Sequence, residues 1–224
     1  MTSEVKMSLP NRAYHEIKRR ILDNDLQPNV IMLEKELADS LDMSRTPVRE
    51  ALIRLSNEGM VEVRPRHGMR VLPVSAADMI EIYQILTALE SQAAEIVAEK
   101  GLTDEKLDNL KKNLDEMDKA LDEDDLIRWS EADAGFHKLL VEYSGNSRLI
   151  SMVNLYFEQS HRVRRLTLQL RPRPVNSNVD HRNVVAAIEE GDPEKARQCH
   201  REHRQKSAKM LVNLLKETTL ANLL

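Results

Sequence analysis

The sequence predicts a mainly α-helical protein, with an N-terminal winged helix-turn-helix followed by an all-α antiparallel six-helix bundle. Two observations lead to this fold class. Before residue 73, short amphipathic segments have apolar residues at helical spacing. Two stretches in which apolar and polar residues alternate, as in β-strands, follow these segments. After residue 75, the apolar stretches repeat with helical spacing, and glycine, proline or capping residues separate them.

The chain divides into four parts on the same grounds. Residues 1–10 lack apolar periodicity and are expected to be a disordered tail. Residues 11–74 are expected to form the winged domain and residues 75–217 the helical domain, with residues 218–224 as a second tail. The 224 residues, of which 41% are hydrophobic, suffice for two small cores.

Three helices are expected in the winged domain. Apolar residues between Tyr14 and Leu22 recur at i, i+3, i+7 and i+8, which indicates the first helix. Glu34 to Leu41 is a short amphipathic segment, and residues 42–44 connect it to the third helix. Two helices joined by such a short connection form a helix-turn-helix.

The third helix is the most clearly marked element of the chain. Val48, Leu52 and Leu55 fall at i, i+4 and i+7, which gives a single apolar stripe. Pro47 suits a first helical turn, because its missing N–H would be unpaired there in any case. Gly59 ends the helix.

Two alternating stretches follow this helix and are expected to pair as a β-hairpin. They are Val61 to Val63 and Met69 to Leu72. The residues between them, 64–68, include two arginines and one histidine. The hairpin is therefore expected to form a wing with a basic tip.

The start of the third helix carries side chains that suit a DNA major groove. Arg45 and Arg49 can each bind O6 and N7 of guanine, and Ser44 and Thr46 can bind phosphate. The alternative is a small helical domain with solvated arginines. The overall net charge of −4 would favour that alternative, but six arginines against three acidic residues lie between Arg45 and Arg70. The positive charge is therefore local, as sequence-specific docking requires.

The stretch LADSLDMSRTPVREALIRLSNEGMVEVRPRHGMRV, from Leu37 to Val71, resembles the DNA-binding domain of GntR-family transcriptional regulators. The string SRTPVREAL within it is a specific signature. The resemblance implies that operator DNA is contacted by Lys35, Ser44, Arg45, Thr46, Arg49, His67 and Gly68, and the basic wing tip adds Arg66. Gly68 would then let the wing approach the minor groove.

Six helices are expected after residue 75. Ser75 caps the first helix, and Asp78 three positions later resembles a capping box. Thr103 caps the second helix. The remaining four helices are expected at residues 125–143, 147–168, 177–190 and 193–217.

One carboxylate and three histidines form the candidate site of this domain. Asp133 and His137 are four residues apart and share one face of the third bundle helix. His181 is expected to start the fifth helix, and His203 lies in the sixth. These donors suit Zn²⁺, Ni²⁺ or a similar divalent ion. Spacing alone leaves open the alternative that these histidines bind no metal and are instead hydrogen-bonded within the protein or exposed to solvent.

The second domain resembles the FCD ligand-binding domain of the FadR-type GntR subfamily. The strings FHKLL, at residues 136–140, and DHRNVVAAIEEGDPEKAR, at residues 180–197, match the family pattern. The resemblance covers residues 11 to 215 and implies that the carboxylate and three histidines named above bind a divalent metal ion. Cys199 and His200 are further potential ligands, although a small buried residue is the expected role of Cys199.

One position departs from the family pattern. Many members have an arginine in the first bundle helix, within Tyr-x-x-Arg-x-x-Leu-Glu, where this chain has Leu86. This difference removes a carboxylate clamp and weakens any assignment of an acidic effector. Arg162, Arg164 and Arg165 could compensate by reaching the cavity, or could form a solvated helix face.

Other features narrow the class of protein. The chain has no run of about 18 apolar residues, so we expect no membrane span. It lacks an apolar signal-peptide core and has a single cysteine, which fits a reducing cytoplasm. Aromatic residues make up only 3%, which argues against a stacking platform for single-stranded nucleic acid.

We therefore expect a homodimeric transcription regulator that binds a short inverted repeat of double-stranded operator DNA. Its helical domain would hold a divalent metal ion, Zn²⁺ or Ni²⁺, and a small-molecule effector, for which a carboxylate is a candidate. The alternative is a metal-dependent hydrolase with an accessory DNA-binding domain, since a metal with an open position can activate water. No motif supplies a general acid or base convincingly, so we favour the regulator and expect no enzyme. The sequence does not distinguish a repressor from an activator.

Overall fold

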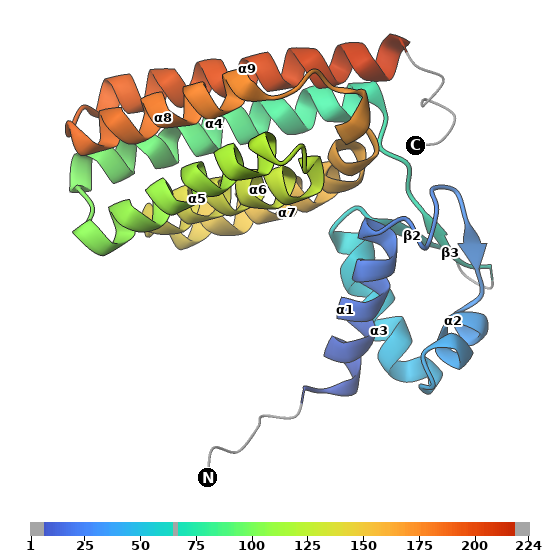
Figure 1. Ribbon diagram of the computed structural model, residues 1–224. Coiled ribbons are helices and arrows are strands. Elements are labelled where there is room, and N and C mark those ends of the chain that lie inside the picture. Colours follow the sequence, from blue (N-terminus) through green and yellow to red (C-terminus); the bar gives the residue numbers. More distant parts are fainter. Residues whose placement is uncertain (1–6, 65–66, 218–224) are drawn as a thin grey trace. The chain divides into compact units, whose positions relative to one another are not determined.

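The computed structural model describes residues 7–64 and 67–217 (Figure 1). The chain forms two compact units, and the division between them falls between Val74 and Ser75. The first unit is a winged helix-turn-helix, and the second is a helical bundle. The predicted fold class is therefore confirmed.

The three helices of the first unit pack around one apolar core. They are α1 (Leu9–Leu22), α2 (Glu34–Ser40) and α3 (Arg45–Asn57). The core contains most of the residues that the helical spacing indicated, together with apolar residues of the sheet: Tyr14, Ile17, Ile21, Leu37, Val48, Ala51, Leu52, Leu55, Val61, Met69 and Val71. Leu22 is partly buried and packs against this core.

Helix α1 begins earlier than the sequence predicted. It starts at Leu9, so the expected tail of residues 1–10 is two residues too long. The reason is Pro10, which occupies the first turn, where its missing N–H removes no helical hydrogen bond. Of the remaining residues of that expected tail, 7–8 belong to no helix or strand, and 1–6 lie outside the described residues, as does the expected tail at residues 218–224.

A small antiparallel sheet completes the first unit. Its strands are β1 (Ile31–Met32), β2 (Val61–Arg64) and β3 (Gly68–Val71), in the order β1-β3-β2. In the predicted hairpin, Val61 pairs with Val71 and Arg64 pairs with Gly68. The sequence did not predict β1, because a two-residue strand is too short to show alternation. Strand β1 pairs with the other edge of β3.

The second unit contains six α-helices among the described residues, and they lie side by side along a common direction (Figure 1). A short 3₁₀ turn, η1 (Leu168–Leu170), follows the fourth of them. The helices are α4 (Ala76–Lys100), α5 (Asp104–Asp122), α6 (Leu126–Tyr143), α7 (Ser147–Leu166), α8 (Val175–Glu189) and α9 (Pro193–Glu217).

The start of α4 has the cap that the sequence predicted. The backbone N–H of Asp78 donates to Ser75 Oγ at 3.1 Å, and the backbone N–H of Ser75 donates to Asp78 Oδ2 at 2.7 Å. The two hydrogen bonds form a capping box, which pairs two N–H groups that the helix itself leaves unpaired. The Thr103 side chain caps α5 in a similar way, by accepting from the backbone N–H of Lys106.

Two helix ends near the candidate site differ from the prediction. Helix α8 begins at Val175, directly after the loop prolines, so His181 lies in its second turn and not at its start. Helix α7 ends at Leu166 and not at Leu168. At that end Thr167 Oγ1 donates to the carbonyl of Val163, a side-chain bond that competes with continuation of the helix.

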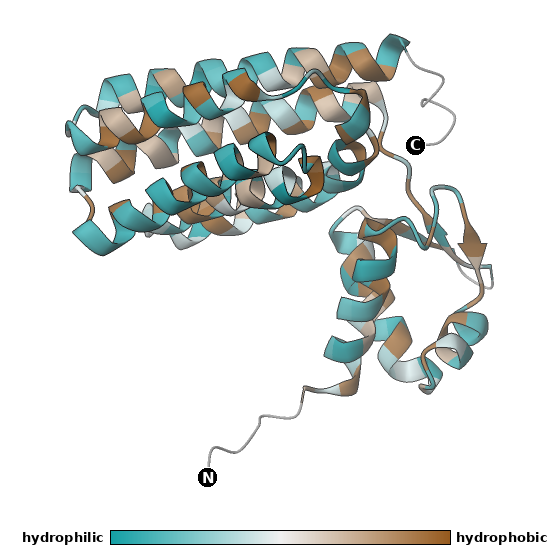
Figure 2. Ribbon diagram, in the orientation of Figure 1, coloured by the Kyte–Doolittle hydropathy of each residue, from teal (hydrophilic) through white to brown (hydrophobic). Residues whose placement is uncertain are grey.

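The apolar faces of these helices form the core of the second unit, with Leu110, Met117, Phe136 and Leu140 fully buried. Figure 2 shows the complementary pattern, since much of the surface of helix α5 that faces the viewer is hydrophilic.

Among the described helices, none is long and apolar enough to cross a membrane.

Gly68 provides a test of how β1 and the hairpin pack together. Its φ is +79°, and a Cβ atom added there would lie 2.0 Å from the carbonyl oxygen of Met32 in β1. Gly68→Ala combines backbone strain with this overlap, so we expect it to destabilise the first unit by about 2 kcal/mol or more. Hydrogen–deuterium exchange of the full-length protein should then become faster in α1 and α3.

Gly191→Ala is the matched control for this variant. Gly191 has a similar φ of +68°, but a Cβ atom there would meet no atom of the described chain within 4 Å. We expect it to leave exchange in α1 and α3 unchanged. Wild-type exchange rates in α1 and α3 of Gly68→Ala would show that the close approach to Met32 is wrong.

Candidate functional site

The expected DNA-contacting residues of the helix-turn-helix lie on the surface of the first unit. Ser44 is the residue that precedes α3, and Arg45 and Thr46 begin the helix. All three side chains are exposed, as are those of Arg49 and of Lys35 in α2. The apolar stripe of α3 packs inward, so this polar end of the helix is free to contact a partner.

Unlike several other arginines of this unit, Arg45 and Arg49 have no ion-pair partner among the described residues. Arg54 pairs with Glu58, and Arg64 and Arg70 both pair with Glu62. Within the described part of the chain, no carboxylate lies within ion-pair distance of Arg45 or Arg49. Their guanidinium groups therefore keep their hydrogen-bond donors available for phosphate or base edges.

The wing residues fall into three cases. His67 is exposed at the turn between β2 and β3, where a DNA contact is feasible. Gly68 is buried, and its positive φ and close approach to Met32 give it a structural reason to be glycine. Arg66 lies outside the described residues.

Three of the predicted metal ligands meet in the interior of the second unit. His137 of α6, His181 of α8 and His203 of α9 are all buried, and one ring nitrogen of each lies within 4.8 Å of the others. The Nε2 atoms of His181 and His203 are 3.1 Å apart. Asp133 Oδ1 lies 3.7 Å from His181 Nε2 and 3.8 Å from His137 Nε2. The structure thus brings together all four residues.

These distances fit the donor set of one metal ion. Nitrogen and oxygen ligands bind Zn²⁺ at about 2.0–2.2 Å, so neighbouring ligands lie about 3–4 Å apart. The Nε2 atom of His137 is buried and has no hydrogen-bond partner in the described chain. An orphaned ring nitrogen is costly unless a ligand uses its lone pair.

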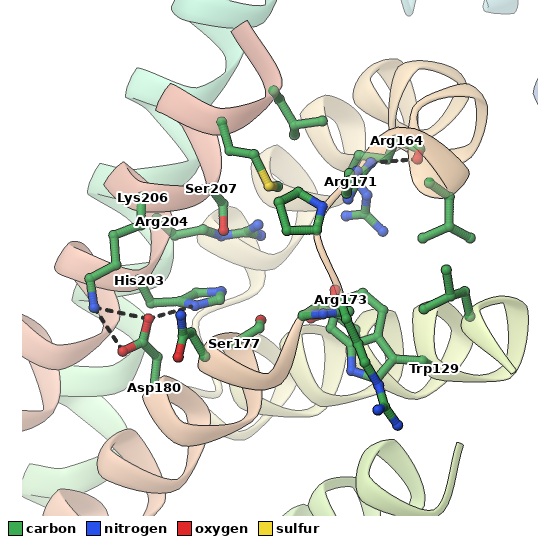
Figure 3. A pocket seen from close by; sticks show the side chains of 18 of the residues that line it. Trp129, Arg164, Arg171, Arg173, Ser177, Asp180, His203, Arg204, Lys206 and Ser207 are labelled. Atoms are coloured by element: carbon green, nitrogen blue, oxygen red, sulfur yellow. Dashed lines mark hydrogen bonds and ion pairs between the residues drawn. The ribbon is translucent and has the colours of Figure 1, made fainter. Parts of the chain in front are cut away.

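Carboxylates lie behind two of the three histidines. Glu90 Oε2 is 2.9 Å from His137 Nδ1, and Asp180 Oδ2 is 3.7 Å from His203 Nδ1. Lys206 in turn donates to Asp180 at 2.8 Å, as Figure 3 shows. A carboxylate at the second ring nitrogen orients a metal-binding imidazole, so the arrangement leaves both Nε2 atoms to converge.

Two of the buried imidazoles, those of His137 and His181, are neutral at pH 7. Burial, together with the positive charge of Arg204, lowers the pKa of His137 well below its usual range. Burial also lowers the pKa of His181 well below the usual range. A neutral imidazole has the lone pair that a metal ligand requires.

Glu90, His137 and His200 form a second buried group with donors within 4.8 Å of one another. Arg204 already binds both oxygens of Glu90, with its Nε atom 3.0 Å from Oε2. The guanidinium neutralises the carboxylate and would repel a second cation. His200 Nε2 is 3.5 Å from Glu90 Oε2, so His200 belongs to this supporting group, beside the group that contains Asp133.

Sequence reasoning gave Glu90 and Arg204 no role. A signal was present, because Glu90 lies four residues after Leu86 and four before Ala94, which places a carboxylate on the buried face of α4. Arg204 lies four residues after His200 and is equally buried. Charged residues at buried helix positions are rare unless they are paired.

A cavity of about 290 Å³ opens beside the histidine cluster (Figure 3). Its lining includes Asp133, His137 and His203, together with Trp129 and arginines from two further segments. Trp129 is held in place by a 2.8 Å hydrogen bond from its Nε1 atom to Asn178. The space is close to the lower end of the range for small-molecule sites.

Among the three arginines considered for this cavity, Arg164 lines it. Its residue exposure is 6%, so the solvated-face alternative is wrong for Arg164. Arg165 is exposed and Arg162 is buried, and neither lines this cavity. Arg171, which follows η1, lines the cavity and had been missed.

A winged helix-turn-helix and a helical bundle with a donor-lined cavity define a class of protein: DNA-binding regulators that respond to a small ligand. Residues 9–71 match the family described as bacterial regulatory proteins, gntR family, and residues 81–206 match the FCD domain. The chain belongs to the GntR family of DNA-binding transcriptional regulators and has a C-terminal effector-binding FCD domain.

Individual relatives agree with this assignment. The chain is 29% identical over 208 residues to the uncharacterised HTH-type transcriptional regulator YdhC of Bacillus subtilis, covering 91% of each chain. It is 33% identical over 195 residues to an uncharacterised HTH-type transcriptional regulator in an unstable DNA locus of Streptomyces ambofaciens, covering 85% and 79% of the two chains. The structure of E. coli McbR/YncC has the same fold, with a TM-score of 0.78 at 24% identity, covering 93% and 99%. The class is non-enzymatic, so the hydrolase alternative is set aside.

The buried neutral histidines predict how the stability of the metal-free protein depends on pH. Burial lowers the pKa of His200 to about 3, so His200 stays neutral in the folded state where the unfolded chain is protonated. Below pH 6.5 the unfolded state therefore binds more protons, and the free energy of unfolding falls as the pH decreases. Each such histidine contributes about 1.4 kcal/mol per pH unit in that window.

Thermal melts of chelator-treated protein between pH 7.5 and pH 4.5 would measure this slope. His200→Gln removes one of the titrating groups and should make the melting temperature less dependent on pH. An identical slope for the variant and the wild type would show that His200 is protonated in the folded state.

Proposed function

We propose that this regulator binds a divalent metal ion through Asp133, His137, His181 and His203, and that a small acidic metabolite in the adjoining cavity controls operator affinity. The observation that carries the proposal is the convergence of these four donors at the wall of a ligand-sized cavity. A bound ion supplies positive charge and a coordination position that attract a carboxylate. The setting of this regulator is the cytoplasm.

Zn²⁺ and Ni²⁺ suit the donor set better than Mg²⁺ or Ca²⁺. Three imidazoles and one carboxylate are borderline donors, whereas the alkaline-earth ions prefer oxygen ligands throughout. Asp133 is partly exposed and the three histidines are buried, and Asp133, His137 and His203 all line the cavity. An acidic ligand would therefore approach the donor set from the cavity.

We further propose that the protein binds a short inverted repeat as a homodimer. One winged unit offers few base-contacting side chains, chiefly at the start of α3, and a two-fold dimer doubles the readout. The exposed groups that support this assignment are Lys35, Ser44, Arg45, Thr46, Arg49 and His67. Arg66 and Gly68 complete the proposed wing contact.

Arg45→Ala and Arg49→Ala are each expected to abolish specific operator binding while preserving the fold. Losing a bidentate guanine contact costs about 1–3 kcal/mol per half-site, and a dimer loses two such contacts. Footprinting titrations, with light scattering to establish the oligomeric state, provide the measurement. Arg54→Ala, which removes an arginine that is already paired with Glu58, is the control. Wild-type affinity of folded Arg45→Ala and Arg49→Ala, or tight binding by a monomer, would contradict the proposal.

His137→Ala, His181→Ala and His203→Ala are each expected to lower the metal content and the response to effector. Operator binding without effector should persist, because the DNA-contacting residues belong to a unit with its own core. Elemental analysis of protein purified without an affinity tag measures the metal. His200→Ala should retain the ion, which distinguishes the two buried donor groups. Wild-type protein that contains no stoichiometric metal and takes up neither Zn²⁺ nor Ni²⁺ would refute the metal site.

A further inference from the structure

The cavity beside the histidine cluster is lined by two buried or part-buried arginines that no carboxylate neutralises, whereas Arg173, which also lines it, is exposed. Arg164 of α7 has a residue exposure of 6%, and Arg171 is part-buried. Both line the cavity. In the described chain, no carboxylate lies within ion-pair distance of either guanidinium. The Arg164 guanidinium instead stacks over the ring of Phe157, with its carbon 3.9 Å from the ring centre.

Two other cations that line this cavity, Arg204 and Lys206, show the contrast. Arg204 binds Glu90 with two hydrogen bonds, and Lys206 binds Asp180. A cation with a carboxylate partner gains nothing from an anionic ligand unless it gives up that partner. The two unpaired guanidinium groups need no such exchange.

An unpaired charge in a buried place is unfavourable for the ligand-free protein. Burial lowers the pKa of Arg164, and it lowers that of Arg171 to about 10, so Arg171 remains protonated at pH 7. Truncating one partner of a buried pair has a large cost because the remaining charge loses its compensation. A ligand that supplies a negative charge here would offset the electrostatic cost of leaving these two guanidinium groups without an anionic partner.

Arg171 is already oriented for such a ligand. Its Nε atom donates to Thr167 Oγ1 at 3.2 Å, and its Nη2 atom donates to the same oxygen and to the carbonyl of Arg164. These hydrogen bonds tie the guanidinium to the end of α7. They leave Nη1 without an acceptor among the described residues, so a ligand can bind it with little further loss of side-chain entropy.

The two arginines lie on the opposite side of the cavity from His203 and Asp180 (Figure 3). One side thus offers the proposed metal donors, and the other offers two guanidinium groups. We propose that Arg164 and Arg171 form a second anion subsite, and that the effector is a small dianion with an acidic group at each end. This inference rests on the proposed function, because the first acidic group is assigned to the metal side.

Isothermal titration calorimetry of the full-length, Zn²⁺-loaded protein tests the second subsite with matched acids. Succinate and glutarate carry two carboxylates, whereas butyrate and valerate have the same chain lengths with only one. We expect each diacid to bind about tenfold to a hundredfold more tightly than its monoacid, as for a charge-assisted hydrogen bond. 3-Phosphoglycerate is included to establish whether the second acidic group is a carboxylate or a phosphate.

Arg164→Met and Arg171→Met should each remove the advantage of the diacid and leave monoacid affinity within about twofold. Arg164→Lys, which keeps the charge, should restore part of it. Arg148→Met is the control, because it removes an exposed arginine from the same helix outside the cavity. Ligand-free Arg164→Met should also melt at the wild-type temperature or above, since it removes an unpaired charge.

Three results would overturn the second subsite. They are equal affinity for diacids and monoacids, unchanged diacid affinity in both methionine variants, and failure of every probe to bind. Metal analysis of the same samples separates this inference from the proposed function. If the ion is present and monoacids bind without any gain from a second acidic group, the metal-linked effector site stands and only the arginine subsite falls.

Discussion

The buried ion pair between Glu90 and Arg204 is the interaction on which the interior of the bundle depends. It joins α4 to α9 across 114 residues of sequence, and both side chains are almost completely enclosed. Glu90 also lies against His137 and His200, so the same carboxylate that balances Arg204 fixes the environment of two imidazoles. Removing one member of such a pair typically costs about 3–5 kcal/mol. The histidine cluster is therefore built on a charge balance between two helices.

Much of the fold could be predicted because helical spacing, caps and glycines act locally. The stripe of α3, the hairpin and the Ser75 cap all depend on residues close together in the sequence. The proximity of Asp133 to His137 follows from one helical turn, whereas the approach of His181 and His203 required the family resemblance. Strand β1 was not predictable, because two residues carry no periodicity and its partner β3 lies far along the chain.

The missed residues of the site share a physical reason. The burial of Glu90 and the burial of Arg204 are explained only by the ion pair between them. The residues next to either one in the sequence do not indicate its partner. Arg171 was missed for a related reason, because its role depends on how the segment after α7 folds back onto Thr167. Arg164 was considered, but helical spacing alone does not distinguish a buried arginine from one on a solvated helix face. Its burial depends on how the helices pack. Sequence patterns thus located the donors and left the charges around them undetermined.

The Glu90–Arg204 pair also restricts how this protein can diverge. A substitution at either position alone leaves an uncompensated charge in the interior. Replacing both residues by uncharged ones therefore requires either a variant with one unpaired buried charge or two simultaneous substitutions. His137 adds a third dependence, because its Nδ1 atom faces the same carboxylate. In the course of evolution, positions 90, 137 and 204 should therefore change together, while the exposed outer faces of α4 and α9 drift independently.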